Sequence, residues 1–137
     1  RRVELRRRRA QLLDRPEPPK LDVLLDEAVL CRVIGGPEVF AEQLRHLLDV
    51  SERPSVSLRV IKFDAPVHPA VGVSFTVFDL PGDPVGVVFR EQLDANGFLD
   101  EPGAVARYRE SLSGAARVAA SAARSRELIA ARLAEVV

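Results

Sequence analysis

The stretch LDEAVLCRVIGGPEVFAEQLRHLLDVSERPSVSLRVIKF, Leu25 to Phe63, decides the fold expected for this chain. Its pattern is typical of a strand, a glycine turn, an amphipathic helix, a short loop and a second strand. Gly35-Gly36-Pro37-Glu38 is a good helix start, because glycine can occupy the cap, proline suits the first helical position and glutamate complements the macrodipole. Pro54 ends this helix, whose apolar residues follow at helical spacing: Phe40, Leu44, Leu47 and Leu48.

After this helix the apolar period changes from about 3.6 to 2, which predicts a half-buried strand at residues 56–60. The same alternation recurs at residues 73–77, and the turn sequence at 81–84 leads into a third apolar segment at 85–93. Three neighbouring strands joined by short loops predict an antiparallel meander. Asn96-Gly97 favours a tight turn into a short last strand.

A basic helix and an apolar strand are predicted before the central helix. Val3 to Leu13 carries leucines among several arginines and predicts a basic helix, which Arg15 to Pro19 ends because prolines disfavour helix. The apolar run Val23 to Ile34 predicts a buried strand, although its periodicity leaves open a helical turn before Asp26. Cys31, the single cysteine, is then expected to be a small buried hydrophobe.

The C-terminal third, after Glu101-Pro102-Gly103, is rich in alanine and predicts helix from Ala104 to Val137, with Gly114 and Ser121 as its weakest points. We expect this segment to form a helical hairpin. The expected fold class is therefore α+β: an antiparallel sheet of about four to five strands with one inserted helix and a C-terminal helical hairpin.

Composition limits the classes of function. The 137 residues suffice for one core, and 20 basic side chains balance 20 acidic ones, so no global field favours nucleic acid or an anionic membrane. No apolar run approaches the roughly 18 residues that span a bilayer, and no segment resembles a signal peptide. The sequence therefore predicts a cytoplasmic protein with no membrane partner. Because the chain opens inside a helix at Arg1 without methionine, we expect a fragment that lacks an N-terminal part.

Motifs for catalysis and metal binding are not found in the sequence. Two histidines and one cysteine without H-x-x-x-H or C-x-x-C spacing argue against zinc, and no nucleophile elbow, P-loop or dinucleotide fingerprint is present. We expect no cofactor, no metal and no enzyme activity. His46 is expected to be solvated. His68, in the loop Ala65-Pro66-Val67-His68-Pro69-Ala70, either lines a pocket or caps backbone groups.

Several polar residues lie in or beside apolar elements, where a charge needs a partner or water. Glu27 and Glu91 stand in this position, and they either join Arg32, Arg90 or Gln43 in a polar patch or form structural ion pairs. We predict a ligand- or partner-binding site that consists of Glu27, Arg32, Gln43, His68 and Glu91.

A family resemblance rests on an ordered set of segments that covers nearly the whole chain. The set begins with RRVELRRRRAQLL, a proline-bearing linker and LDEAVLCR, and continues with GGPEVFAEQL and PSVSLRV. His68 before an FTVF strand, then VVFREQL and a helical end from Glu101, complete it. In this order the segments resemble the C-terminal domain of actinobacterial helix-turn-helix regulators of the XRE (Cro/repressor-like) type, a domain of unknown function.

The resemblance implies a regulatory role. Residues 1–14 would be a linker helix from an absent N-terminal DNA-binding module, and residues 15–137 a sensor or interaction domain. The implied partner is a short acidic protein encoded nearby, in an antitoxin-like arrangement, or else an unknown small-molecule effector. DNA would be bound only through the absent module. A dimerisation module, with a homodimer as its product, and an enzyme on an unrecognised scaffold are the alternatives.

Overall fold

The computed structural model describes residues 2–92 and 97–137 and divides the chain into two compact units. Unit 1 contains residues 1–63 and 120–137, and unit 2 contains residues 64–119. The second unit is therefore inserted into the first along the chain. No helix in the described residues combines the length and the apolar character needed to cross a membrane.

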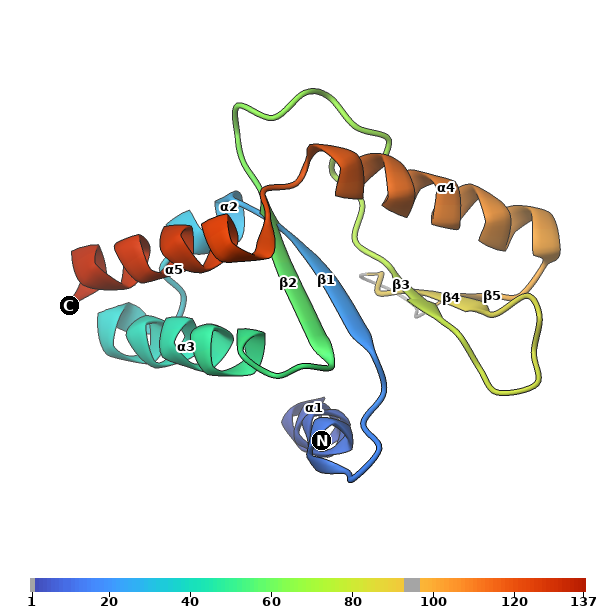
Figure 1. Ribbon diagram of the computed structural model, residues 1–137, viewed down its shortest axis with the longest axis horizontal. Coiled ribbons are helices and arrows are strands. Elements are labelled where there is room, and N and C mark those ends of the chain that lie inside the picture. The colour runs from blue at the N-terminus through green and yellow to red at the C-terminus, as the bar shows by residue number, and fades with distance from the viewer. Residues whose placement is uncertain (1, 93–96) are drawn as a thin grey trace. The chain divides into compact units, whose positions relative to one another are not determined.

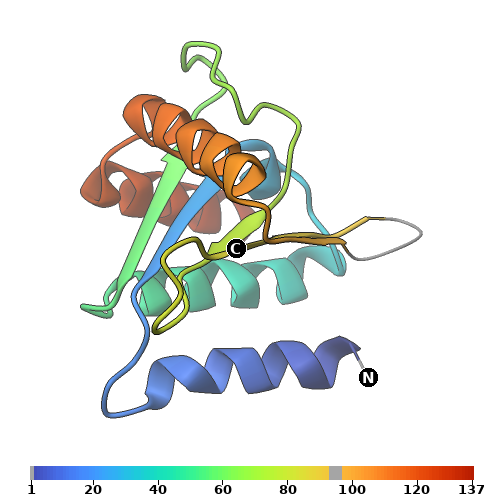
Figure 2. The ribbon, with the colours of Figure 1, turned by 90° about the vertical axis from the view of Figure 1, so that its right-hand side faces the viewer.

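Unit 1 contains a two-stranded parallel sheet, in which β1 (Leu21–Asp26) pairs with β2 (Val56–Ile61) from Leu21↔Val56 to Asp26↔Ile61. The two strands lie side by side in both Figure 1 and Figure 2. Parallel strands need a long crossover connection, and α3 (Gly36–Ser51) supplies most of it. The remaining elements of the unit are α1 (Arg2–Ala10), the 3-10 helix η1 (Gln11–Asp14), α2 (Ala28–Cys31) and α5 (Ala122–Val136).

The core of unit 1 forms where α3 and α5 pack on each other and on β2. Its fully or nearly fully buried side chains are Leu44 of α3, Val60 of β2 and Ile129 of α5. The predicted helix and its apolar face are thus confirmed. Gly35 and Gly36 before α3 have φ values of 80° and 88°, which explains why glycines occupy this turn.

Ser125, which is completely buried, ties α5 to β2. Its hydroxyl accepts a hydrogen bond from the Val60 N–H (2.8 Å) and donates one to the Ser121 carbonyl (2.7 Å). The Val60 carbonyl accepts from the Ala120 N–H (2.9 Å), and Arg59 donates from Nε to the Ala120 carbonyl (2.9 Å). The edge of β2 that faces away from β1 is therefore satisfied by a segment about sixty residues further along the chain.

Unit 2 is a three-stranded antiparallel meander covered by a helix. Its strands are β3 (Thr76–Phe78), β4 (Val87–Arg90) and β5 (Gly97–Leu99), in the order β3-β4-β5, and the helix is α4 (Pro102–Val118). α4 packs on β3 and β4. Val88 and Val105 are almost wholly buried in this unit.

The expectation of one antiparallel sheet of four to five strands is wrong. The strand at residues 56–61 pairs in parallel with β1, whereas the three later strands form a sheet of their own. The two helices of the expected C-terminal hairpin belong to different units: α5 packs on α3 and β2 of unit 1, and α4 packs on the sheet of unit 2. The predicted turn at Asn96-Gly97 falls on Asn96, which lies outside the described residues.

The predicted strand Val23–Ile34 is too long. β1 ends at Asp26, whose carboxylate accepts a hydrogen bond from the Ala28 N–H (2.9 Å) and so supports the helical turn α2 after the strand rather than before it. Cys31 lies at the end of that turn and is exposed, so its expected burial is wrong as well.

Candidate functional site

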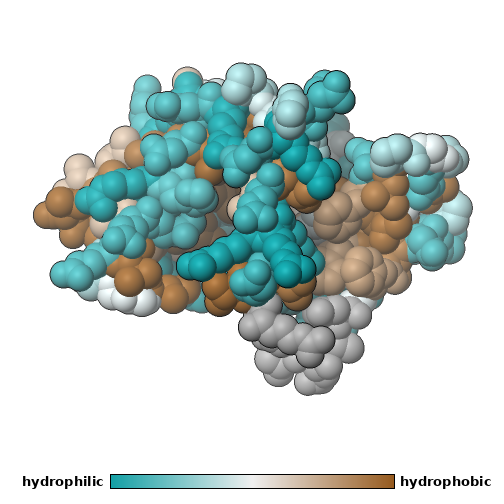
Figure 3. All heavy atoms as spheres, turned by 90° about the horizontal axis from the view of Figure 1, so that it is seen from below, coloured by the Kyte–Doolittle hydropathy of each residue, from teal (hydrophilic) through white to brown (hydrophobic). Residues whose placement is uncertain are grey.

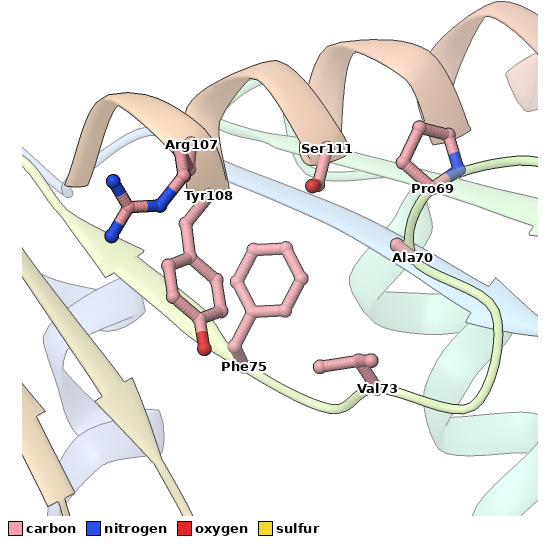
Figure 4. Close-up of a pocket in the computed structure, with 7 residues that line it drawn as sticks. All are labelled: Pro69, Ala70, Val73, Phe75, Arg107, Tyr108 and Ser111. Atoms are coloured by element: carbon pink, nitrogen blue, oxygen red, sulfur yellow. The ribbon is translucent and has the colours of Figure 1, made fainter. Parts of the chain in front are cut away.

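Unit 2 contains an open pocket between the segment 69–75 and α4, which we call the α4 pocket (Figure 4). Its volume is about 280 Å³. The loop contributes apolar walls, and α4 contributes the polar groups. The lining residues are Pro69, Ala70, Val73, Phe75, Arg107, Tyr108 and Ser111.

Close contact between Pro69 and Gly114 holds one end of the α4 pocket. A Cβ atom at Gly114 would lie 2.8 Å from Pro69 Cδ, so only glycine lets the loop approach the helix this closely. Phe75 and Tyr108 pack against each other, with ring centroids 4.9 Å apart in an edge-to-face arrangement. Figure 4 shows both rings beneath the helix, with Arg107 on one side of them and Pro69, Ala70 and Val73 on the other.

The α4 pocket has one charged lining residue, Arg107, with Ser111 one helical turn further along. Within residues 2–92 and 97–137, the exposed side chain of Arg107 forms no hydrogen bond or ion pair. Its charge acts on Glu101, the N-cap of α4. The pKa of Glu101 is lowered mainly because its carboxylate accepts hydrogen bonds from the Gly103 and Ala104 N–H groups, with a smaller effect of Arg107.

Behind Tyr108 lies a second cation. Arg90 donates from Nη1 to the Tyr108 hydroxyl (3.3 Å), while its buried Nε has no hydrogen-bond partner in the described part of the chain. Because this hydroxyl already accepts from Arg90, its own proton remains available for donation. The α4 pocket thus combines aromatic surface, one cation and hydroxyl groups, which is the composition of a small-molecule binding site.

A second open pocket of about 280 Å³ lies in unit 1, between α2 and α5. Its cation is already used: Arg132 donates from Nε to the Leu30 carbonyl (2.7 Å), pairs with Glu135 (2.8 Å) and lies 5.8 Å from the centre of the Phe40 ring. The side chain of Arg132 thus serves the packing of α5, which leaves the α4 pocket as the stronger candidate. This second pocket is lined by Glu27, Leu30, Cys31, Leu128, Ala131, Arg132 and Glu135.

Comparison with known proteins assigns the chain to a family. Residues 1–131 match the family described as "Domain of unknown function (DUF5753)". The chain belongs to the DUF5753 family. No curated protein and no solved structure matches it. The resemblance is thereby confirmed at the level of a domain of unknown function.

The five predicted site residues of this DUF5753 domain are divided between the two units. Unit 1 contains Glu27, Arg32 and Gln43, and unit 2 contains His68 and Glu91. Arg32, Gln43 and Glu91 are exposed, and Glu27 lines the second of the two pockets described above. Their role in a common site stays a prediction.

Two of these residues have recognisable local roles. The Glu27 carboxylate accepts a hydrogen bond from the Phe63 N–H (2.6 Å), which fixes the end of β1 to the chain leaving β2. His68 is half-buried, directly before the pocket residue Pro69, and its Nδ1 is buried with no hydrogen-bond partner in the described residues. The loop that carries His68 thus borders the α4 pocket, although His68 is not among the lining residues, and a role of His68 in binding stays a prediction.

Sequence reasoning missed Arg107, Tyr108 and Ser111. Tyr108 lies at helical spacing from Val105 and Leu112, a pattern that indicates an apolar helix face rather than a ligand contact. The available signal was the spacing of Arg107 and Ser111 by four residues, which places both on one face of a helix. That signal is weak without knowledge of which loop covers the face.

Formal charge is distributed unevenly in the DUF5753 domain. Unit 1 has 16 basic and 12 acidic residues, a net charge of +4, and unit 2 has 4 basic and 8 acidic residues, a net charge of −4. Much of the positive charge of unit 1 belongs to α1, which includes four consecutive arginines, Arg6 to Arg9. Figure 3, which looks onto this helix from below, shows its strongly hydrophilic side chains at the centre.

Proposed function

We propose that this DUF5753 domain is the partner-binding regulatory domain of a helix-turn-helix transcriptional regulator, and that it binds an acidic partner protein through α1. DNA recognition belongs to a module outside these residues. The support is the resemblance to XRE-type regulators together with the charge, exposure and length of α1.

The exposure of α1 carries this proposal. The helix has nine residues and is exposed from Val3 to Ala10, with apolar side chains in the open: Val3 is 65% and Leu5 is 52% exposed. Isolated helices shorter than about 12–15 residues are marginal in water, because nucleation is costly and few hydrogen bonds follow. A surface ion pair such as Arg8–Glu4, at 3.6 Å, adds little. Val3 and Leu5 point to different sides of the helix, because they are two residues apart, and a partner that covers either of them would supply part of the missing stabilisation.

The chemistry of α1 determines the kind of partner. Arg6 to Arg9 distribute positive charge around α1, and unit 1 as a whole is positive. A complementary partner has carboxylates that face these arginines, because opposite potentials speed encounter and fix the register of the complex. The short acidic protein that the resemblance implies has this character. Binding at the linker helix would let the partner act on an adjoining DNA-binding module.

Calorimetric titration of the chain with the short acidic protein encoded beside its gene tests the proposal. We expect a saturable complex whose affinity falls with rising salt, because exposed charge pairs are screened. Arg7→Glu should weaken the complex about tenfold or more, since it replaces an attraction by a repulsion.

The matched control is Arg117→Glu, a charge reversal at an exposed arginine of α4 in the other unit, which should leave the affinity unchanged. An equal loss of affinity in both variants would mean that the partner responds to the net charge of the protein and not to α1, which would overturn the assignment. If α1 binds duplex DNA in preference to the acidic protein, α1 is a DNA-binding segment and the proposal is wrong. If α1 instead mediates a homodimer, the domain is a dimerisation module.

A further inference from the structure

The α4 pocket carries a second, independent inference, which concerns a small molecule. Two parts of its wall are held by contacts within unit 2, namely the Pro69–Gly114 contact and the Phe75–Tyr108 pair. A volume of about 280 Å³ lies at the small end of ligand sites. The pocket therefore suits a molecule with a single ring or a short chain.

The walls of the α4 pocket favour a ligand with an apolar, aromatic part. Val73, Phe75 and Pro69 offer apolar surface, and the Tyr108 ring lies edge-to-face against Phe75. A further ring can extend this aromatic arrangement, because edge-to-face and offset contacts are favourable beyond the burial of area. An aromatic body fits these walls better than a sugar-like polar one, whose hydroxyl groups would face carbon.

Arg107 selects the charge. It is the only charged residue among the seven that line the α4 pocket, and its exposed side chain forms no hydrogen bond or ion pair with the described residues. A guanidinium binds a carboxylate through two parallel hydrogen bonds. Glu101, on whose carboxylate the charge of Arg107 acts, reduces the attraction for an anion, whereas physiological salt screens the charges of unit 2 that lie beyond about 8 Å.

We propose that the α4 pocket binds a small aromatic monocarboxylate, with the carboxylate at Arg107 and the ring against Phe75 and Tyr108. Such a ligand would make this domain responsive to a metabolite as well as to a protein partner. The inference goes beyond the partner-binding role and stands without it, because the groups involved lie in unit 2 and α1 belongs to unit 1.

The chain provides its own reporter for the test. Tyr108 is the only tyrosine and there is no tryptophan, so intrinsic fluorescence reports directly on the α4 pocket. Three probes share one ring and one chain length and differ in charge: phenylacetate, 2-phenylethanol and phenethylamine. We expect phenylacetate to change the fluorescence saturably and to bind about tenfold or more tightly than the alcohol, as loss of a charge-assisted hydrogen bond predicts. The amine should bind most weakly.

Variants connect the effect to Arg107. Arg107→Gln should reduce phenylacetate affinity to that of the alcohol and leave the alcohol unchanged, whereas Arg107→Lys should retain part of the preference for the acid. Arg117→Gln, on the same helix but outside the lining, is the control and should behave like the wild type.

Equal affinities of the acid and the alcohol, an unaffected Arg107→Gln variant, or no saturable signal up to the solubility limit of phenylacetate would each overturn the inference. The same titrations in the Arg7→Glu variant should match the wild type. The experiments therefore distinguish the two proposals: one can fail because the partner does not bind α1, and the other because the α4 pocket does not bind an anion.

Discussion

Replacement of Ser125 by alanine should destabilise unit 1 more than its small change in volume suggests. The serine is completely buried, and its hydroxyl is the acceptor for the equally buried N–H of Val60, at 2.8 Å. Alanine leaves this N–H without a partner and without water, which costs about 1–3 kcal/mol. The other hydrogen bond of the hydroxyl, to the Ser121 carbonyl, matters less, because that carbonyl still accepts from the Ser125 N–H (2.8 Å).

Urea unfolding followed by far-ultraviolet circular dichroism measures this loss. Ser113→Ala, at an exposed position of α4, is the matched control and should change the free energy of unfolding by less than about 0.5 kcal/mol. Tyrosine fluorescence, which arises from Tyr108 in unit 2, should show whether the two units unfold together. A loss below about 0.5 kcal/mol for Ser125→Ala would refute the reasoning, because the Val60 N–H would then have found another acceptor.

Three further predictions follow from packing, backbone geometry and charge. Leu44→Ala should lower the free energy of unfolding by about 2–5 kcal/mol in the same urea experiment, because the side chain is 1% exposed in the core of unit 1. A loss below about 0.5 kcal/mol, as expected for an exposed side chain, would mean that the buried face of the helix is wrong. Gly86→Ala should lower the melting temperature strongly, since φ is 86° and a Cβ atom would lie 2.6 Å from the Phe78 carbonyl oxygen, whereas Gly82→Ala meets a similar φ in open space and should cost less. Glu101 has a lowered pKa in the folded state, so its stabilising effect is present above the ordinary carboxyl pKa and is lost as pH falls through the folded pKa. The melting-temperature difference between wild type and Glu101→Gln should therefore shrink on acidification, and a difference independent of pH would contradict the capping role.

The local elements with a clear period could be predicted from sequence. The helix from Gly36 to Ser51 and the strand from Val56 to Ile61 have start signals, stop signals and regular apolar spacing, and the structure confirms both. The end of β1 could not be predicted, because the apolar run continues to Ile34 and only the side chain of Asp26, which accepts from the Ala28 N–H, decides between strand and turn. Hydrophobicity alone does not distinguish these alternatives.

Pairing between elements was beyond sequence reasoning for a different reason. An alternating strand shows which side chains are buried but not which strand is its neighbour. The parallel pairing of β2 with β1, and the packing of α5 on β2 through Ser125 and Ile129, depend on tertiary contacts. The α4 pocket could not be predicted for the same reason, because no local sequence pattern shows that the loop at residues 69–75 packs beside Arg107.

The insertion of unit 2 into unit 1 has a consequence for synthesis on the ribosome. Val60 and Ser125, which hydrogen bond in the finished domain, are 65 residues apart. At a synthesis rate of about 5–20 residues per second, roughly 3 to 13 seconds separate the synthesis of β2 from that of α5. This helix covers the edge of β2 and contributes Ile129 to the core. Unit 2 is a continuous segment whose contacts are local, so it can form within that interval. The edge of β2 on a nascent chain would thus stay exposed until α5 emerges, and aggregation or a chaperone would compete with folding during this interval.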